Sequence, residues 1–515
     1  MRINYFLILT ITFFRCSNPN SPSNTTESKT NVLVIHVNDK KQTIHNFGAS
    51  DAWTCKYIGQ WPDDKRNQVA DWLFSKEMDA DGRPKGIGLS LWRFNIGAGS
   101  TAQDNIADEW RREEGFLKDD RSYDWSKQAG QQWFLRAAKQ RGIEQFLAFT
   151  NSPPVQLTKN GKAFSDDGSQ ANIAAENYLP FANYLFTVAR HFRDAGTPFN
   201  YISPFNEPQW DWTGASQEGS PYTNNEIVSI TKILDSILTK NNETTTIQIA
   251  EAGKLNYLYE AADKQTRGDQ IHTFFDNQSS LYVGDLTHVD KIISGHSYFT
   301  TTAETLKSTR QNVSSKINTA SVPLEFWQSE YCILGNDNEI TAGGKDIGMT
   351  PALYVAKVIH HDLTVANASA WHWWLSVTVY DYKDGLIYAD KNKINGQIED
   401  TKLLWALGNY SRFIRPESVR IGVTADDLNL SNVNGIMASS YLNEEEHKVI
   451  TVIINYSTSD TALKFQMDGA SVSSWQPYIT GQGSDEKLKP LAAINETDSI
   501  TIPRKSIVTL VGDLE

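Results

Sequence analysis

The sequence is poor in cysteine and positive charge, and it lacks a long apolar run. Three cysteines in 515 residues are too few for a disulfide scaffold and show no paired zinc-site spacing, so Cys55 and Cys332 are expected to be free, buried thiols. Lys and Arg number 48 against 61 Asp and Glu, and the net charge of −13 argues against a nucleic acid or anionic membrane as partner. No phosphate-binding glycine loop or histidine-rich metal motif is present. We therefore expect neither metal nor cofactor, and the oligomeric state is not indicated.

The most apolar stretch near the N-terminus is residues 6–14. It is shorter than the roughly 20 residues of a transmembrane helix and follows a basic residue, as in an export signal. Cys16 follows it after Arg15, and the polar residues 17–30 predict a flexible tether. The sequence thus predicts an export signal at 1–16, with lipid attachment at Cys16 left open, and a protein that is secreted, periplasmic or anchored at the cell surface.

From residue 31 to about residue 414, short apolar runs alternate with amphipathic helical segments. This alternation is typical of a parallel α/β fold. Eight candidate strands, the number in a (β/α)8 TIM barrel, can be identified. They are residues 47–53, 88–95, 145–150, 201–206, 246–250, 291–297, 324–330 and 368–374.

Helix start signals lie between these strands. Thr223 and Glu226 form a capping-box pattern before an apolar stripe. Ser126 is a candidate N-cap for a helix that stops near residue 142, and Thr350 with Pro351 predicts another helix start. These patterns indicate the outer helices of a barrel.

After about residue 414 the pattern changes to short alternating strands without an evident helix. An all-β segment of about 100 residues can bury a sandwich core. We expect residues 31–46 to supply an N-terminal strand that joins this sandwich. The predicted domains are therefore a catalytic barrel at 47–414 and a β-sandwich at 415–515.

Two glutamates lie at the ends of opposite strands of the predicted barrel. Glu207 follows the fourth strand and Glu330 ends the seventh, and the C-terminal ends of barrel strands carry the reacting groups. Glycosidic bond hydrolysis needs one carboxyl to protonate the leaving oxygen and another to attack or to activate water. A salt-bridged strand end explains either glutamate alone. The two together favour a glycosidase.

The motif Asn206-Glu207-Pro208, with a glutamate ending strand seven, resembles the clan of retaining β/α-barrel glycosidases. The chain from about residue 44 to 414 resembles glycoside hydrolase family 30, whose members also carry a trailing β domain. Within the family it is most similar to the endo-β-1,6-galactanase branch. The supporting segments are FGAS at 47–50, LWRFN at 91–95, NSPP at 151–154, HSY at 296–298 and WHW at 371–373.

The resemblance implies double displacement with net retention. Glu330 would be the nucleophile, and Glu207 would donate a proton and later activate water. The same resemblance places Arg93 near the nucleophile and directs the hydroxyl of Tyr298 to it. Asn206 resembles the residue that binds the sugar 2-hydroxyl, a bond that strengthens in the transition state.

Further side chains are expected around the site. His296 has the same strand parity as Tyr298, and Trp371 and Trp373 share a face from which either could stack on a sugar ring. Core packing or loop tethering is the alternative for each. Five residues at or beyond other strand ends are also candidates to contact sugar: Trp53, Trp210, Trp212, Asp51 and Asn151.

A pocket for uronic acids would need clustered cations near the site. Arg111 and Arg112 are a pair, but glutamates at 109, 113 and 114 surround them. This pattern predicts a solvated helix face.

The favoured function is hydrolysis of a β-linked polysaccharide by an endo-β-1,6-galactanase-like enzyme. An exo-acting β-fucosidase, β-xylosidase or β-glucosidase is the alternative, and a non-catalytic surface glycan-binding protein is a lesser one. The C-terminal domain could itself bind sugar through Trp475 and Tyr478, although packing explains both side chains.

Overall fold

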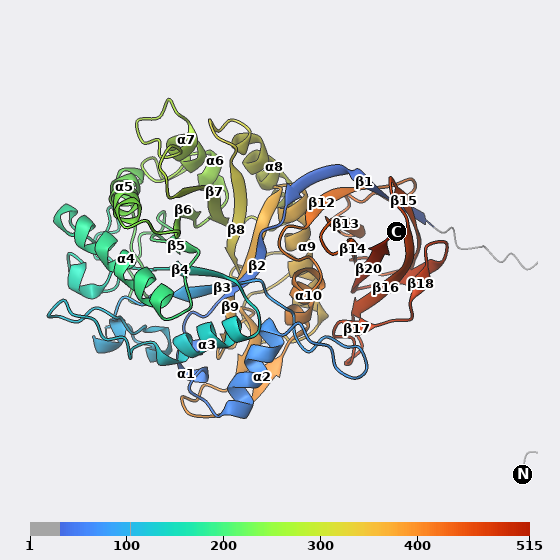
Figure 1. Cartoon of the computed structure of the whole chain (residues 1–515), viewed down its shortest axis with the longest axis horizontal. Coiled ribbons are helices and arrows are strands. Elements are labelled where there is room, and N and C mark those ends of the chain that lie inside the picture. Colours follow the sequence, from blue (N-terminus) through green and yellow to red (C-terminus); the bar gives the residue numbers. More distant parts are fainter. Residues whose placement is uncertain (1–30, 104) are drawn as a thin grey trace, which may run out of the picture.

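The computed structural model describes residues 31–103 and 105–515. The expected export signal, tether and lipid site at Cys16 lie outside these residues. In the described ranges, no helix has both the length and the apolar character needed to cross a bilayer. The strands form two ten-stranded sheets, one in a barrel and one in a C-terminal β domain (Figure 1).

The first sheet contains a closed parallel barrel. Strand β9 pairs with both β2 and β8, which closes the ring, and each of the eight barrel strands overlaps one predicted strand. The predicted (β/α)8 barrel is therefore confirmed. Strands β10 and β11 extend the sheet from β9. The bounds are β2 (Asn46–Ser50), β3 (Leu91–Asn95), β4 (Gln145–Phe149), β5 (Tyr201–Ser203), β6 (Thr246–Ala252), β7 (Val289–His296), β8 (Glu325–Tyr331), β9 (Ala368–Thr378), β10 (Gly385–Ala389) and β11 (Ile398–Asp400).

Helices surround the barrel and bury their apolar faces against it (Figure 1). The α-helices are α1 (Cys55–Ile58), α2 (Asp63–Phe74), α3 (Ala129–Gln140), α4 (Tyr178–Asp194), α5 (Asn224–Lys240), α6 (Asn256–Tyr259), α7 (Gln270–Phe275), α8 (Thr305–Ile317), α9 (Met349–Thr364) and α10 (Lys402–Ser411). Short 3-10 turns are η1 (Ser100–Ala102), η2 (Glu109–Arg111), η3 (Val155–Leu157) and η4 (Ala175–Asn177).

The helix starts agree only in part with the sequence signals. The capping box of Thr223 and Glu226 is confirmed at the start of α5. Ser126 as an N-cap is wrong, because its hydroxyl and backbone N–H both donate to the carboxylate of Asp124 in a turn, and α3 starts only at Ala129. Helix α9 starts at Met349, so Thr350 lies inside its first turn and is not the cap.

The second sheet forms the C-terminal domain and includes the N-terminal strand. Strand β1 pairs antiparallel with β12 and parallel with β15. The rings of Phe465 on β15 and Trp475 on β16 lie 5.8 Å apart although these strands are distant along the sheet path, so the sheet folds over a core of its own. The bounds are β1 (Asn31–Thr43), β12 (Val419–Ala425), β13 (Ile436–Asn443), β14 (Lys448–Asn455), β15 (Thr461–Asp468), β16 (Val472–Thr480), β17 (Lys489–Pro490), β18 (Ile494–Asn495), β19 (Ser499–Ile502) and β20 (Ser506–Leu514).

This arrangement accounts for the aromatic residues of the β domain. Trp475 is fully buried in its core, and Tyr478 packs on Phe413 with ring centroids 4.7 Å apart. Strands β19 and β20 are separated at Pro503, which cannot donate a ladder hydrogen bond.

Helices α9 and α10 lie between the two sheets (Figure 1). Asn409 of α10 is fully buried and donates its amide N–H to the hydroxyl of Thr480 at 2.8 Å. The hydroxyl of Thr509 in turn donates to the carbonyl oxygen of Asn409 at 2.8 Å. The β domain is thus joined to the barrel by buried hydrogen bonds as well as apolar packing.

Candidate active site

Glu207 lies in the loop that follows β5, with a left-handed φ of 45°. Its backbone N–H donates to the carbonyl oxygen of Glu251 at 2.9 Å, and its own carbonyl oxygen accepts from the backbone of Trp210 and the indole of Trp212, each at 3.1 Å. A non-glycine residue in this region is unfavourable unless its surroundings hold it there. The bonds on both sides of the peptide therefore fix the direction of this carboxylate.

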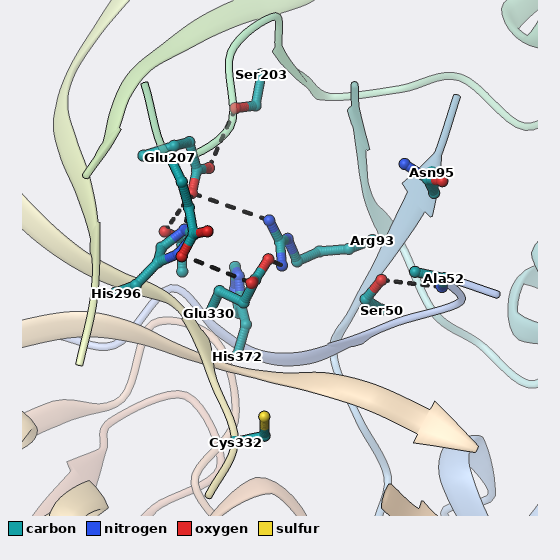
Figure 2. Close-up of polar contacts among 12 residues, drawn as sticks. Ser50, Ala52, Arg93, Asn95, Ser203, Glu207, His296, Glu330, Cys332 and His372 are labelled. Carbon is teal, nitrogen blue, oxygen red and sulfur yellow. Dashed lines mark hydrogen bonds and ion pairs between the residues drawn. The ribbon is translucent and has the colours of Figure 1, made fainter. Parts of the chain in front are cut away.

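Glu330 lies near the end of β8 and faces Glu207 (Figure 2). Arg93 on β3 donates to Glu330 Oε2 at 3.1 Å, and the hydroxyl of Tyr298 donates to Oε1 at 3.1 Å. Burial raises the pKa of the Tyr298 hydroxyl well above its usual range, so this group stays a donor. Burial also raises the pKa of Glu330, and the positive charges of His296 and Arg93 oppose that rise. The ionised form of Glu330 therefore depends on these two cations.

The two carboxylates are close together. One oxygen of Glu207, one oxygen of Glu330 and a ring nitrogen of His296 all lie within 4.8 Å of one another. Retaining glycosidases have carboxyl groups about 5 Å apart, whereas inverting enzymes need a wider gap for water. This spacing matches the retaining geometry.

His296, at the end of β7, lies between three carboxylates (Figure 2). Its Nδ1 is 3.0 Å from Glu207 Oε1 and 3.7 Å from Glu330 Oε1, and its Nε2 is 2.9 Å from Glu251 Oε2. Burial alone would lower the pKa of His296, but the charge of Glu330 and the hydrogen bonds to Glu207 and Glu251 outweigh it and raise this pKa to about 10. The ring is therefore an imidazolium that donates from both nitrogens.

Glu251 is a member of the site that the sequence analysis missed. It is buried at the end of β6 and accepts from the hydroxyls of Ser329 at 2.6 Å and Ser203 at 3.1 Å, with Arg93 Nη2 at 3.9 Å. Burial alone would raise its pKa, but the hydrogen bond from His296 and the charge of Arg93 lower the pKa to about 2. It is thus an anion at neutral pH beneath the pair. Its position directly after the predicted fifth strand was the signal available in the sequence.

A cavity of about 680 Å³ opens above these groups. Its size lies within the range of ligand sites in proteins. The structure brings both glutamates and five other predicted residues to its wall: Asn206, Tyr298, Trp53, Trp210 and Trp212. The amide oxygen of Asn206 is buried and has no partner within the described chain, so it is an acceptor available to a ligand.

Six other predicted residues do not line this cavity: Arg93 and His296, which contact the two glutamates, and four more. The indoles of Trp371 and Trp373 are fully buried and donate to Asp362 and to the carbonyl oxygen of residue 384, both at 2.9 Å. Asp51 is fully buried and accepts from the backbone of Asn95 at 2.8 Å, and Asn151 is also buried. Burial raises the pKa of Asp51 to about 8. Trp371 therefore ties β9 to α9, and the contacts of Trp373 and Asp51 lie within the barrel wall.

Trp374 lines the cavity where Trp371 and Trp373 do not. In the pairing of β2 with β9, Ala49 is opposite Trp373 and Ser50 is opposite Leu375, so Trp374 is an inserted residue. A bulge of this kind breaks the alternation of side chains along a strand. Simple parity therefore could not predict which tryptophan reaches the cavity.

Arg111 also lines the cavity, which corrects the prediction of a solvated helix face. Its guanidinium lies 4.8 Å from the ring centroid of Trp53 and 5.0 Å from that of Tyr380. The turn η2 brings this segment over the barrel mouth, and cation–π contacts with both rings hold the side chain there.

Glu207, His296 and Glu330 also have the residue types of a metal site. A metal ligand must be deprotonated, however, and both nitrogens of His296 donate to carboxylates. Arg93 already places a positive charge on Glu330. These contacts favour a proton-transfer site, and the absence of a metal remains a prediction.

Comparison with known proteins agrees with this geometry. A family model described as O-glycosyl hydrolase family 30 matches residues 30–388. A conserved exported protein from Bacteroides fragilis has a TM-score of 0.88 and 35% identity, with 93% of this chain and 100% of that chain covered. The catalytic domain of a family 30 xylanase C from Talaromyces cellulolyticus has a TM-score of 0.66 at 19% identity, covering 93% and 99% of the two chains.

One stretch of the chain is similar in sequence to an enzyme of known activity. It is 30% identical over 121 residues to an exo-β-1,6-galactobiohydrolase from Bifidobacterium longum subsp. longum. The match spans 23% of this chain and 8% of that enzyme. With the family model matching most of the chain and two carboxylates at retaining distance, the chain belongs to O-glycosyl hydrolase family 30, the retaining glycoside hydrolases of β-linked glycans.

Proposed function

We propose that this enzyme hydrolyses β-1,6-linked galactan, with Glu330 as the nucleophile and Glu207 as the general acid/base. The observation that carries the assignment is the pair of facing carboxylates within 4.8 Å. Arg93 and Tyr298 donate to the two oxygens of Glu330 and orient it for attack, whereas the carboxylate of Glu207 accepts from His296.

In the first step Glu330 attacks the anomeric carbon while Glu207 transfers its proton to the leaving oxygen. The imidazolium of His296 then donates to the Glu207 carboxylate, which stabilises its new charge. In the second step Glu207 takes a proton from water, the water oxygen attacks the anomeric carbon, and Glu330 leaves. The amide oxygen of Asn206 accepts a hydrogen bond from the sugar 2-hydroxyl.

The aromatic wall supports a sugar substrate, and the local match supports the β-1,6-galactan class. Trp53, Trp210, Trp212 and Trp374 line the cavity, where aromatic rings can pack against the apolar side of sugar rings. The named relative acts, by its name, on β-1,6-linked galactose.

Two adjoining cavities favour endo action. One of about 140 Å³ shares Tyr298, Phe299, Cys332 and Leu334 with the catalytic cavity. Another of about 260 Å³ shares Tyr380 and Asp381. The shared lining residues place both cavities beside the catalytic cavity, which supports binding of more than one sugar unit, as mid-chain cleavage requires.

Exo release of disaccharide is the second candidate, because the named relative is an exo enzyme. Chromatography of early products from β-1,6-galactan, β-1,3-galactan, β-1,6-glucan and xylan separates the candidates. A ladder of oligosaccharides from β-1,6-galactan supports endo action, and galactobiose alone supports exo action. Cleavage of xylan or glucan without galactan would contradict the proposed substrate.

We also propose that the chain is exported, with residues 1–16 as the signal. The similar Bacteroides fragilis protein is described as exported, which supports this location. Mass spectrometry of the mature N-terminus tests it. A lipid-modified Cys16 would show anchoring, cleavage beyond it would show release, and an intact N-terminus in the cytoplasm would contradict export.

A further inference from the structure

A second cavity, of about 230 Å³, lies where the barrel meets the β domain. It is formed by residues of α8, α9, β12 and β13 and shares none with the catalytic cavity. Its charged and ionisable lining consists of Lys307, His360, His361 and Arg420, and no described carboxylate lines it. This lining is unusual in a chain whose net charge is −13.

The two formal cations of this cavity are not neutralised by carboxylate partners. Arg420 donates to the amide oxygens of Gln42 at 2.9 Å and Asn367 at 2.8 Å, both of which are neutral. Within residues 31–103 and 105–515, neither Arg420 nor Lys307 forms an ion pair. The cavity therefore carries positive charge available to a ligand.

The histidines add unused hydrogen-bonding groups. His360 is only 6% exposed, and its Nδ1 has no hydrogen-bond partner in the described chain. His361 directs Nδ1 to the carbonyl oxygen of Lys357 at 2.8 Å, which leaves Nε2 for another partner. A buried polar atom without a partner in the protein is available to a ligand or a water molecule.

We propose that this cavity binds a compact oxyanion, such as a sulfate, phosphate or carboxylate group, between the barrel and the β domain. Lys307 and Arg420 supply the charge, and the histidine rings supply donors once they take up a proton. The bound anion would bridge α8 and α9 to β12, so it would stabilise the junction between domains.

The surrounding charges fix the expected pH dependence. Arg310 is paired with Asp362 at 2.7 Å, and Lys357 is paired with Glu339, so these two cations are offset. Asp39 is the acid whose charge acts on Arg420, and Tyr441 also lies near it.

Burial and neighbouring cations keep the pKa of both cavity histidines low, with that of His361 at about 4. An anion favours their protonated forms, so binding takes up protons. Affinity should therefore rise by about tenfold as the pH falls from about 7.5 to about 5.5.

Isothermal titration of the full chain with sulfate tests this site, because sulfate stays a dianion over this pH range. Chloride holds the ionic strength constant. We expect one saturable site that tightens at low pH and is weakened about tenfold in Lys307→Gln and in His360→Asn. Lys316→Gln is the matched control, since Lys316 lies on the same helix but pairs with Asp269 at 2.8 Å and does not line the cavity.

Phosphate and galacturonate titrations distinguish an inorganic anion from the acid group of a sugar. Lys307 is exposed, so Lys307→Gln keeps the test valid if His360→Asn does not fold. No saturable sulfate binding at low pH, or binding that Lys307→Gln leaves unchanged, would overturn the proposal. Equal weakening of sulfate binding in Lys316→Gln would also overturn it, because the loss would then reflect the overall charge of the protein and not this cavity.

Discussion

Replacing Glu251 with glutamine should remove the negative charge that holds His296 and Arg93 beside Glu207 and Glu330. Glu251 is the anion that accepts from His296 Nε2 at 2.9 Å and from Ser329 at 2.6 Å. Glutamine keeps the shape but removes the charge. A charge-assisted hydrogen bond contributes about 1.5–3 kcal/mol, which equals one to two pKa units at about 1.4 kcal/mol per unit. We therefore expect the pKa of His296 to fall from about 10 to between about 8 and 9.

The same substitution should reduce stability with a defined pH dependence. Because the folded-state pKa of Glu251 is lowered from 4.5 to about 2, its contribution is present above pH 4.5 and is lost as the pH falls towards 2. The shift corresponds to about 3 kcal/mol near neutral pH. Glu251→Gln should lose this amount, and kcat/KM should fall about tenfold to a hundredfold because His296 and Arg93 lose a shared partner.

NMR of histidine-labelled enzyme across alkaline pH measures the His296 titration directly, and urea unfolding measures stability. Glu243→Gln is the matched control, since Glu243 is a buried carboxylate paired with Arg193 and precedes β6 at its opposite end. It should lose stability without moving the His296 titration. A Glu251→Gln enzyme with an unchanged His296 pKa and unchanged kcat/KM would refute this account.

Three further predictions concern single side chains. Arg93→Gln should shift the acid limb of the kcat/KM profile to higher pH, because the already raised pKa of Glu330 loses an opposing cation; an unmoved limb would contradict this. Trp374→Ala should raise KM about fivefold with a smaller change in kcat, as expected for about 1 kcal/mol of lost stacking, whereas Trp371→Phe should leave KM unchanged. The pKa of His361 is about 4 in the folded protein, below its ordinary value of 6.5, so as the pH falls this histidine takes up a proton in the unfolded chain before it does in the folded protein. The free energy of unfolding should therefore fall by about 1.4 kcal/mol between pH 7.5 and 5.5, and His361→Gln should remove that part of the loss in urea titrations.

The facing pair of glutamates, Glu207 and Glu330, could be predicted from the sequence because both residues obey simple positional rules. Glu207 and Glu330 follow strands that face each other across the barrel, and strand ends of such barrels carry the reacting groups. Arg93, Asn206 and Tyr298 lie at or near the ends of β3, β5 and β7, and the structure places all three at the site. Strand order and the family resemblance were sufficient for these residues.

The missed residues depend on local irregularities. Trp374 reaches the cavity because β9 has an inserted residue, which reverses the parity that favoured Trp371 and Trp373. Arg111 reaches it because the turn η2 lies over the barrel mouth, although its acidic neighbours suggested solvent. Glu251 lies inside β6, directly after the predicted strand 246–250, which ended two residues too early. Bulges and strand ends cannot be identified from apolar periodicity alone.

The most direct test of the central claim uses azide with Glu207→Ala and Glu330→Ala and an aryl β-glycoside that the parent enzyme cleaves. If Glu330 is the nucleophile, Glu207→Ala still forms the glycosyl-enzyme, and azide displaces Glu330 to give the β-glycosyl azide. Glu330→Ala lacks that intermediate, so azide attacks the substrate once and gives the α-glycosyl azide. Proton NMR of the anomeric products distinguishes the two. The account predicts this pair of products, and the reverse pair, or full activity in either variant, would contradict it.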